Sequence, residues 1–196
     1  MHPELLSMSL FMFVTSCSPG PNNIVASYSG FNFGLIKTIP HMCGVIFGFT
    51  TLVTVVNFGL ISVFKNFPII QEILKYGGTI FLIYLAYKIS FSNASSDSIS
   101  ENPVKFIETF FFQFLNPKAV IVAIIIVSTY VESGKVFINY SLWVIGVAFF
   151  FACVSITFWT LLGKFLRKFA TNEKFIKWFN YVMSILLIGC ISTFYY

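Results

Sequence analysis

The segment Ser18-Pro19-Gly20-Pro21-Asn22-Asn23 interrupts the first long apolar run of this 196-residue chain, which extends from Leu5 to Ser29. A run of about 20 apolar residues is long enough to cross a bilayer as a helix. Each proline lacks an amide hydrogen and pushes the preceding residue out of the α region. Within hydrocarbon, such a break is tolerated only where protein or a water-filled cavity satisfies the freed polar groups. The segment therefore predicts a broken membrane helix, in which the break serves either packing or a binding site.

The composition indicates an integral membrane protein. Hydrophobic residues make up 57% of the chain and charged residues only 10%, whereas a soluble domain carries roughly 25% charged residues. The net charge of +5 comes mostly from short connections beside apolar runs, so we interpret it as a signal of membrane orientation rather than of nucleic-acid binding. The four cysteines are scattered singly without metal-ligand spacing. The sequence therefore predicts no metal site, no disulfide framework and no cofactor.

The pattern of apolar runs predicts an all-α membrane protein with six transmembrane helices. The expected spans are 5–29, 39–64, 68–91, 106–130, 136–160 and 173–196. Between the third and fourth spans lies a Ser- and Asn-rich stretch, 92–105, which we interpret as a linker. It divides a single membrane domain, 1–196, into two halves at about 1–91 and 106–196, with three helices each.

The positions of the prolines relate the two halves to each other. Pro19, Pro21 and Pro117 lie inside the first span of each half. The other prolines lie at or just before the start of a span, where a helix tolerates them: Pro3, Pro40, Pro68 and Pro103. Three helices per half force the second half to insert upside down relative to the first. Broken helices in matching positions of inverted repeats are a recurring transporter architecture, with the substrate near the breaks.

Basic residues are distributed unevenly between the two ends of the predicted spans. One set of connections carries Lys37, Lys88, Lys105, Lys164, Arg167, Lys168, Lys174 and Lys177, and the other set carries Lys65, Lys75 and Lys135. Lysine and arginine are in excess in the cytoplasmic loops of membrane proteins. The sequence therefore predicts that both termini lie outside the cytoplasm.

The first break supplies polar groups suited to binding. Pro21 suits the first position of a second half-helix, and the free amides of Asn22 and Asn23 would then point into the break. A helix N-terminus attracts negative charge by about 0.3–1 kcal/mol when exposed and up to ~2 kcal/mol when partly buried. We therefore predict that Pro19, Gly20, Pro21, Asn22 and Asn23 bind substrate. A packed kink whose amides are capped by a neighbouring helix is the alternative.

The segment Asn116-Pro117-Lys118 repeats this arrangement in the second half. Asn116 is a good helix cap and Pro117 suits the first helical position. Lys118 is the only basic residue well inside an apolar span. A lysine at mid-membrane costs roughly 2.5–3.5 kcal/mol on insertion scales, so it marks a functional site unless it snorkels to an interface. Gln113, one turn earlier, would face the same side of the break, and these four residues complete the predicted substrate site.

Four glycines are predicted to pack helices closely. Gly44 and Gly48 form a GxxxG motif, which lets helix backbones approach each other, and we interpret Gly77 and Gly78 of the third span in the same way. His41 and Asn57 are polar residues in the second span. For both we expect an interhelical hydrogen bond rather than substrate contact.

At these residues the chain resembles the LysE/RhtB superfamily of amino-acid exporters. That family carries a PGPN signature in its first helix, here Pro19 to Asn22, and an Asn-Pro-Lys at the start of its second half, here Asn116 to Lys118. The resemblance covers nearly the whole chain. Many relatives carry an acidic residue directly after the second glycine of span two, where this chain has Phe49. The remaining pattern is more similar to the cysteine/O-acetylserine exporter branch.

The resemblance implies a secondary transporter of the bacterial cytoplasmic membrane. It would export a small neutral amino acid or derivative, of the cysteine/O-acetylserine, homoserine or threonine type, by alternating access. Its partners would be the amino-acid substrate and the lipid bilayer. A proton as coupling ion and a homodimer are left open.

Two other classes of function fit the pattern less well. A passive channel for small solutes would explain a break, but it usually needs a symmetric oligomer or a polar lining, and these spans contain few polar residues. An intramembrane enzyme needs a nucleophile–base pair or metal ligands, yet His2 and His41, the two histidines, have no clustered acidic partners. We therefore predict a transporter and not an enzyme, with the passive channel as the alternative.

Overall fold

The computed structural model describes residues 2–60, 66–91, 103–132 and 134–195, and every regular element within these ranges is a helix. The all-α prediction is confirmed for this part of the chain. Most of the predicted linker, 92–102, lies outside the described residues. The elements are α1 Leu5–Cys17, α2 Pro21–Val55, the π-helical η1 Val56–Leu60, α4 Pro68–Ser90, α5 Phe106–Leu115, α6 Pro117–Tyr130, α7 Phe137–Leu166, the 3₁₀-helical η2 Arg167–Phe169, and α8 Glu173–Ser192.

The helix is broken at both proline motifs. Helix α1 ends at Cys17 and α2 begins at Pro21. The two residues that precede a proline, Ser18 and Gly20, are both extended (φ −66°, ψ 146° and φ −174°, ψ 172°), because the proline ring disfavours the α region for them. At the second motif Asn116 is extended in the same way, and α5 and α6 meet at an angle of 65°.

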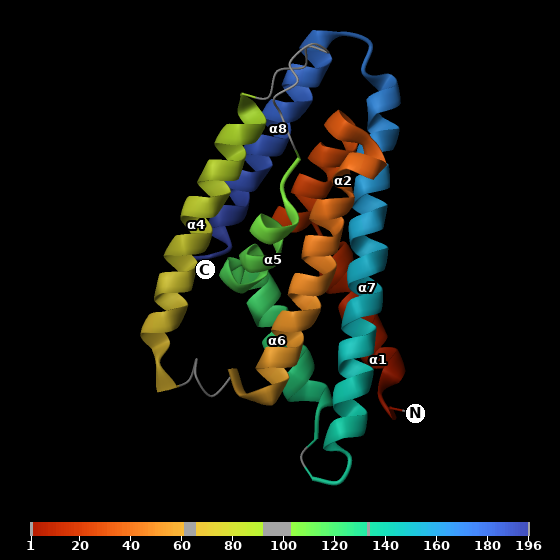
Figure 1. Ribbon diagram of the computed structural model, residues 1–196, viewed down its shortest axis with the longest axis vertical. Coiled ribbons are helices and arrows are strands. Elements are labelled where there is room, and N and C mark those ends of the chain that lie inside the picture. The colour runs from red at the N-terminus through yellow and green to blue at the C-terminus, as the bar shows by residue number, and fades with distance from the viewer. Residues whose placement is uncertain (1, 61–65, 92–102, 133, 196) are drawn as a thin grey trace.

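Helix α2 reverses direction at Gly34. The Nε2 atom of His41 lies 3.4 Å from the carbonyl oxygen of Asn22, although in a straight helix residues 19 positions apart would be separated by about 28 Å. Gly34 has φ 75° and ψ 177°, a conformation that glycine adopts without steric cost. Residues 35–60 therefore run back beside residues 21–33 (Figure 1).

The reversal corrects the predicted second span. That span was expected to begin at residue 39, with Pro40 at its start. The helix instead resumes directly after Gly34, and Pro40 lies inside it. A glycine at positive φ turns the chain before the proline is reached, so the proline does not define the helix start.

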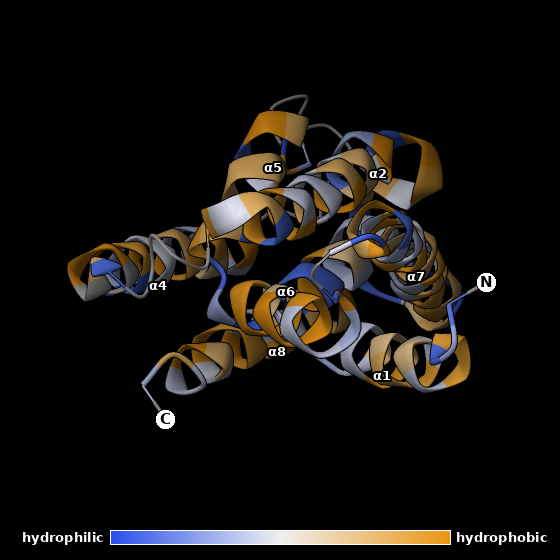
Figure 2. Ribbon diagram, turned by 90° about the horizontal axis from the view of Figure 1, so that it is seen from below, coloured by the Kyte–Doolittle hydropathy of each residue, from blue (hydrophilic) through white to orange (hydrophobic). Residues whose placement is uncertain are grey.

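The helices form one elongated bundle. Viewed along the bundle, α6 lies near the centre with α1, α7, α2, α5 and α8 around it and α4 at the edge (Figure 2). Helix α2 packs mainly on α7, and α4 mainly on α8. The end of α4 and the connection between α7 and α8 lie at one end, while the connection between α6 and α7 lies at the other (Figure 1).

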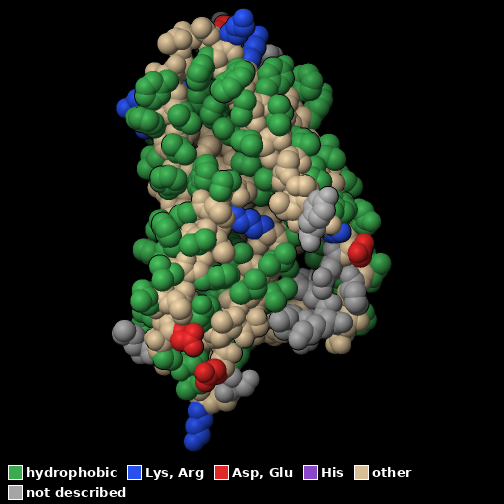
Figure 3. Space-filling model, turned by 180° about the vertical axis from the view of Figure 1, so that it is seen from behind, with side chains coloured by type: hydrophobic (Ala, Val, Ile, Leu, Met, Phe, Trp, Pro, Cys, Tyr) green, Lys and Arg blue, Asp and Glu red, His purple; other side chains and the backbone are tan. Residues whose placement is uncertain are grey.

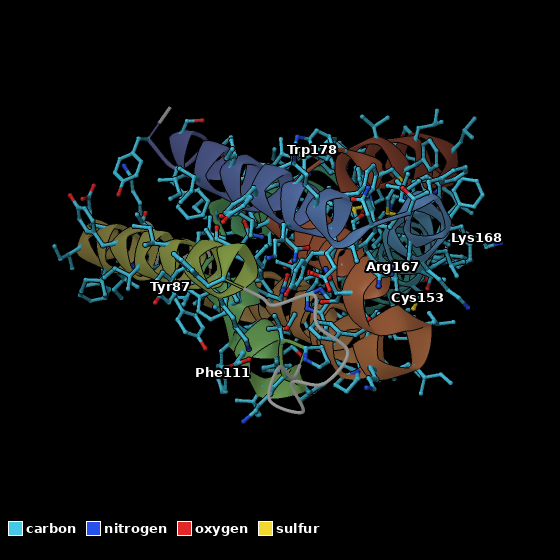
Figure 4. The ribbon with its side chains drawn as sticks, turned by 90° about the horizontal axis from the view of Figure 1, so that it is seen from above. Tyr87, Phe111, Cys153, Arg167, Lys168 and Trp178 are labelled. Carbon is cyan, nitrogen blue, oxygen red and sulfur yellow. The ribbon has the colours of Figure 1, made fainter. Side chains whose placement is uncertain are left out.

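The outer surface suits a lipid environment. Among the described residues, Pro21–Leu60, which consists of two segments that run in opposite directions, and Phe137–Phe169 and Glu173–Ser192 are long and apolar enough to cross a membrane, and the bent pair of α5 and α6 is a further candidate if it is counted as one span. Hydrophobic side chains cover most of the face in Figure 3, and charged ones lie at its two ends and at a few places near mid-height, one of them close to the centre of the face. Tyr87, Phe111 and Trp178 lie on the outer sides of their helices (Figure 4) and are 65%, 59% and 59% exposed.

Glycines at the predicted positions hold α5 between two helices. A Cβ atom on Gly44 would lie 2.7 Å from the carbonyl oxygen of Phe106, and one on Gly48 would lie 2.7 Å from that of Phe110. On the other side of α5, a Cβ atom on Gly78 would overlap the carbonyl oxygen of Leu115. Gly77 is less crowded, because its nearest neighbour is a leucine methyl at 3.4 Å. These contacts fix the position of the helix that carries Gln113.

Two further glycines, which sequence analysis did not single out, bring α2 and α7 into backbone contact. A Cβ atom on Gly30 would overlap the carbonyl oxygen of Thr160, and one on Gly163 would overlap that of Ser27. The Ser27 hydroxyl donates a hydrogen bond of 3.0 Å to the carbonyl oxygen of Trp159 at the same contact. The most extensive helix pair of the bundle therefore depends on two positions that have no side chain.

Replacing Gly163 by alanine should lower the free energy of unfolding by about 1–3 kcal/mol, because the helices must separate to admit a methyl group. Unfolding of the purified protein in detergent would measure the change. Gly146→Ala in the same helix is the matched control, since its Cβ atom would meet nothing within 4 Å and alanine favours helix by up to about 1 kcal/mol. Equal stability of the two variants would contradict the close contact.

Candidate functional site

The two helix breaks face each other across one pocket in the bundle. Its volume is about 520 Å³, counting the space at its open mouth. All the predicted substrate-site residues line it except Pro19 and Pro117: Gly20, Pro21, Asn22, Asn23, Gln113, Asn116 and Lys118. Pro19 contributes only its carbonyl group, through Lys118, and Pro117 lines a separate groove beside α4.

Lys118, from the second break, is bound to the first. Its ammonium nitrogen donates to the carbonyl oxygen of Ser18 at 3.0 Å, to the Ser18 hydroxyl at 2.7 Å and to the carbonyl oxygen of Pro19 at 3.2 Å. A lysine ammonium has three donors, so these bonds match its full capacity. They satisfy carbonyls that the break in the helix releases. The positive charge also lies at the C-terminus of α1, the negative end of its dipole.

Asn22 and Gln113 form a second link between the breaks. The Asn22 amide donates to Gln113 Oε1 at 2.8 Å, and the Gln113 amide donates back to Asn22 Oδ1 at 3.1 Å. The Gln113 amide also donates to the carbonyl oxygen of Thr109 at 2.8 Å. Gln113 is fully buried, whereas Asn22 is partly exposed to the pocket. This pair holds the start of α2 against the last turn of α5.

Asn23 forms hydrogen bonds with the carbonyl groups that the first break leaves free at the end of α1. Its amide donates to the carbonyl oxygens of Ser16 and Ser18 at 2.8 and 2.9 Å. The hydroxyl of Ser155 on α7 donates to the same Ser16 carbonyl at 2.6 Å and lies 3.4 Å from Asn23 Oδ1. The carbonyls at the end of α1 therefore have defined partners on both α2 and α7.

The two half-helices that start at the breaks are capped differently. The side chain of Asn116 accepts from the backbone amide of Lys118 at 3.2 Å, the capping role that its position predicted. Helix α2 has no side-chain cap among the described residues, and Gly20 is its N-cap. The first-turn amides of α2, at Asn22 and Asn23, are therefore left for a ligand or for water.

Several pocket residues were not predicted from the sequence. The polar ones are Thr15, Ser16 and Ser155, and the apolar ones are Val45, Phe49, Ala119, Val122, Ala152 and Ile156. Ser155 is one of two serines in a long apolar span, and this polarity is the only signal that the sequence gives for it. The apolar residues carry no signal, because they resemble the rest of their helices. Phe49 lines the pocket. Many members of the resembled family carry an acidic residue at this position.

The pocket is electropositive. Of the described residues that line it, only Lys118 carries a charge, and the N-termini of α2 and α6 add partial positive charge. Among the described residues no group of three or more His, Cys, Asp or Glu side chains could hold a metal ion. Tyr28 and Phe112, which are both aromatic and close to the breaks in sequence, belong to a buried apolar cluster and do not line the pocket. The arrangement suits a small ligand with a carboxylate.

An apolar helical bundle with two broken helices and a small polar pocket between them has the features of a membrane translocator. The LysE type translocator family model matches residues 13–195, and the chain belongs to this family. The cysteine/O-acetylserine efflux proteins of Salmonella paratyphi A and Salmonella typhi are each 30% identical to it, over the full length of both chains. The protein of the same name from Escherichia coli K12 is 27% identical, again over both full lengths. No solved structure matches the chain.

Family membership confirms the resemblance that the PGPN and Asn-Pro-Lys motifs carried. The chain is a transporter and not an enzyme, and it is a multi-pass protein of the bacterial cytoplasmic membrane. Its partners are therefore a small-molecule substrate and the lipid bilayer.

Proposed function

We propose that this protein is a secondary transporter that exports a small neutral amino acid or derivative by alternating access. The substrate is of the cysteine/O-acetylserine, homoserine or threonine type. The observation that carries the proposal is the single pocket formed by both helix breaks, in which Lys118 is the one charged lining residue within the described part of the chain. A proton drives export, and two copies of the chain associate as a homodimer.

The proposed architecture is six transmembrane helices in two inverted three-helix repeats. In the first repeat α1 and residues 21–33 make the broken helix, followed by residues 35–60 and α4. In the second repeat α5 and α6 make the broken helix, followed by α7 and α8. Lys118 of the second repeat bonds to the break of the first, and Asn22 of the first repeat pairs with Gln113 of the second. Movement of one repeat against the other would therefore act directly on the pocket.

The pocket supports recognition of a neutral amino acid. The substrate carboxylate lies at the uncapped first turn of α2, where Asn22 and Asn23 supply backbone amides and Lys118 supplies charge. The side chain of the substrate lies against the apolar wall of Val45, Phe49 and neighbouring residues. An additional positive charge on the substrate would face Lys118 without a carboxylate to balance it.

Counterflow in proteoliposomes tests this function. Vesicles loaded with unlabelled cysteine or O-acetylserine should take up the labelled compound transiently above its equilibrium level, since a carrier exchanges one molecule for another. Lysine should compete at least about tenfold more weakly, because like charges in contact cost several kcal/mol. Equilibration without an overshoot would identify a passive channel instead. Equal competition by lysine would contradict the neutral-substrate assignment, and the mass of the detergent-solubilised protein tests the dimer.

A further inference from the structure

His41 makes a polar contact with both proposed repeats behind the pocket. The side chain is 2% exposed and lies on the second segment of α2. Its Nδ1 atom is 3.0 Å from the Thr109 hydroxyl on α5, and its Nε2 atom is 3.4 Å from the carbonyl oxygen of Asn22 at the first break. Interhelical hydrogen bonding was predicted for this residue and is confirmed. The two partners of His41 also determine which protonation states of its ring can form hydrogen bonds.

The partners of His41 accommodate the imidazole both with and without its second proton. The Asn22 carbonyl can only accept, so Nε2 is the donor in either state. In the neutral ring Nδ1 accepts from the Thr109 hydroxyl. In the charged ring Nδ1 donates to that oxygen, and the Thr109 hydroxyl turns to the carbonyl oxygen of Lys105, which is 3.1 Å away. Rotation of one hydroxyl group therefore satisfies both states.

The contact links the start of α5 to the pocket. Lys105 is exposed and precedes the first residue of α5, so the carbonyl that receives the Thr109 hydroxyl is at the end of the helix. At the other side, Gln113 donates to the Thr109 carbonyl and pairs with Asn22 in the pocket wall. A movement of Thr109 relative to His41 would therefore also move the Gln113 side chain, which helps to form the pocket.

Few charged groups lie on the elements around His41. On α5 they are Lys105, at its start, and Glu108, which accepts from the Lys105 backbone amide at 2.9 Å. On α6 the charged residue is Lys118, across the pocket, and on α7 it is Lys164, near the helix end. Residues 21–33, the segment of α2 that contains Asn22, contain none, and the segment that contains His41 carries Lys37, which is exposed and lies one turn before it.

We propose that His41 binds the coupling proton, an inference that rests on the proposed export function. A proton from water adds to the Nδ1 lone pair on one side of the membrane and returns to water on the other, and no other bond is made or broken. A ligand shifts a conformational equilibrium only if it binds the two states differently. His41 meets this condition because its partners belong to different repeats, whose relative movement would separate Asn22 from Thr109. Charge-assisted hydrogen bonds are about twice as strong as neutral ones, so protonation favours the state in which both partners are in place.

Two assays on the same proteoliposomes test the proton site. His41→Gln should reduce substrate accumulation driven by an imposed pH gradient at least about tenfold, within the usual range of coupling between sites, and should leave counterflow within about twofold of wild type. His2→Gln is the matched control, because the other histidine bonds to the carbonyl oxygen of Tyr130 at 2.8 Å and does not line the pocket. It should retain both activities. Thr109→Val keeps the histidine but removes the hydroxyl. Like His41→Gln, it should lose accumulation driven by the pH gradient and keep counterflow.

Several outcomes would overturn the proton site. They are undiminished pH-driven accumulation in His41→Gln, or the loss of both activities in a His41→Gln protein that folds. If His41→Gln does not fold, the test is made with Thr109→Val. Wild-type activity of Thr109→Val in both assays would then overturn the inference. Wild-type protein that shows counterflow but no response to a pH gradient contradicts the proton site alone. Wild-type protein without counterflow contradicts the export function itself.

Discussion

Replacing Lys118 by methionine is expected to reduce export roughly 10- to 150-fold, which corresponds to about 1.5–3 kcal/mol, the range for a hydrogen bond to a charged group. Methionine keeps a flexible apolar stem of similar length but cannot donate to Ser18 or Pro19. The substitution therefore leaves the freed carbonyls of the first break without their donor. It also removes the charge that would attract a substrate carboxylate.

Export from cells, divided by the amount of protein in the membrane, measures the effect of this substitution. Lys164→Met is the matched control, because Lys164 is exposed in the last turn of α7 and does not line the pocket. Its export should equal that of the wild type. Normal export by Lys118→Met would rule out a role for the ammonium in transport. Loss of export in proportion to the amount of protein would show that Lys118 acts mainly by holding the break together.

The breaks themselves could be predicted because the effect of proline is local. Pro21 and Pro117 bias the preceding residues towards extended conformations, and the observed helix ends lie where this bias predicts them. The cost of a lysine in hydrocarbon likewise predicted that Lys118 would need a site. It did not indicate which groups would form that site. The carbonyls of Ser18 and Pro19 lie 100 and 99 residues away along the chain, and only the tertiary structure brings them to the ammonium.

Features that depend on how helices dock could not be predicted. Gly34 lies in the connection expected between the first two spans, at 30–38, but the sequence did not indicate that a single residue at positive φ would make the reversal and that the helix would resume directly after it. Gly30 and Gly163 are important because each meets a carbonyl of the other helix, and no local pattern marks such a contact. Ser155 reaches the first break only because α7 docks there. By contrast, the interhelical hydrogen bond predicted for Asn57 is confirmed, with a donor–acceptor distance of 2.9 Å to the Ser141 hydroxyl.

The pair formed by Asn22 and Gln113 should behave as one unit in a double-mutant cycle. Either alanine substitution leaves the partner amide without its reciprocal hydrogen bonds beside the pocket. An unsatisfied buried polar group costs about 1–3 kcal/mol, so each single variant should export roughly 5- to 150-fold more slowly than wild type. The double variant removes both partners and leaves neither amide unsatisfied. Its export should therefore be no slower than that of the worse single variant, with a coupling energy of about 0.5–3 kcal/mol.

Asn57 and Ser141 provide the matched control for this cycle. They also form a side-chain hydrogen bond between helices, but neither residue lines the pocket. Alanine substitutions there should change the free energy of unfolding and leave the export rate per molecule within about twofold of wild type, as expected for a site distant from the pocket. Additive effects of Asn22→Ala and Gln113→Ala on export would show that the two amides act independently. In that case the link between the breaks would rest on Lys118 alone, and the start of α2 could move in the transport cycle without α5.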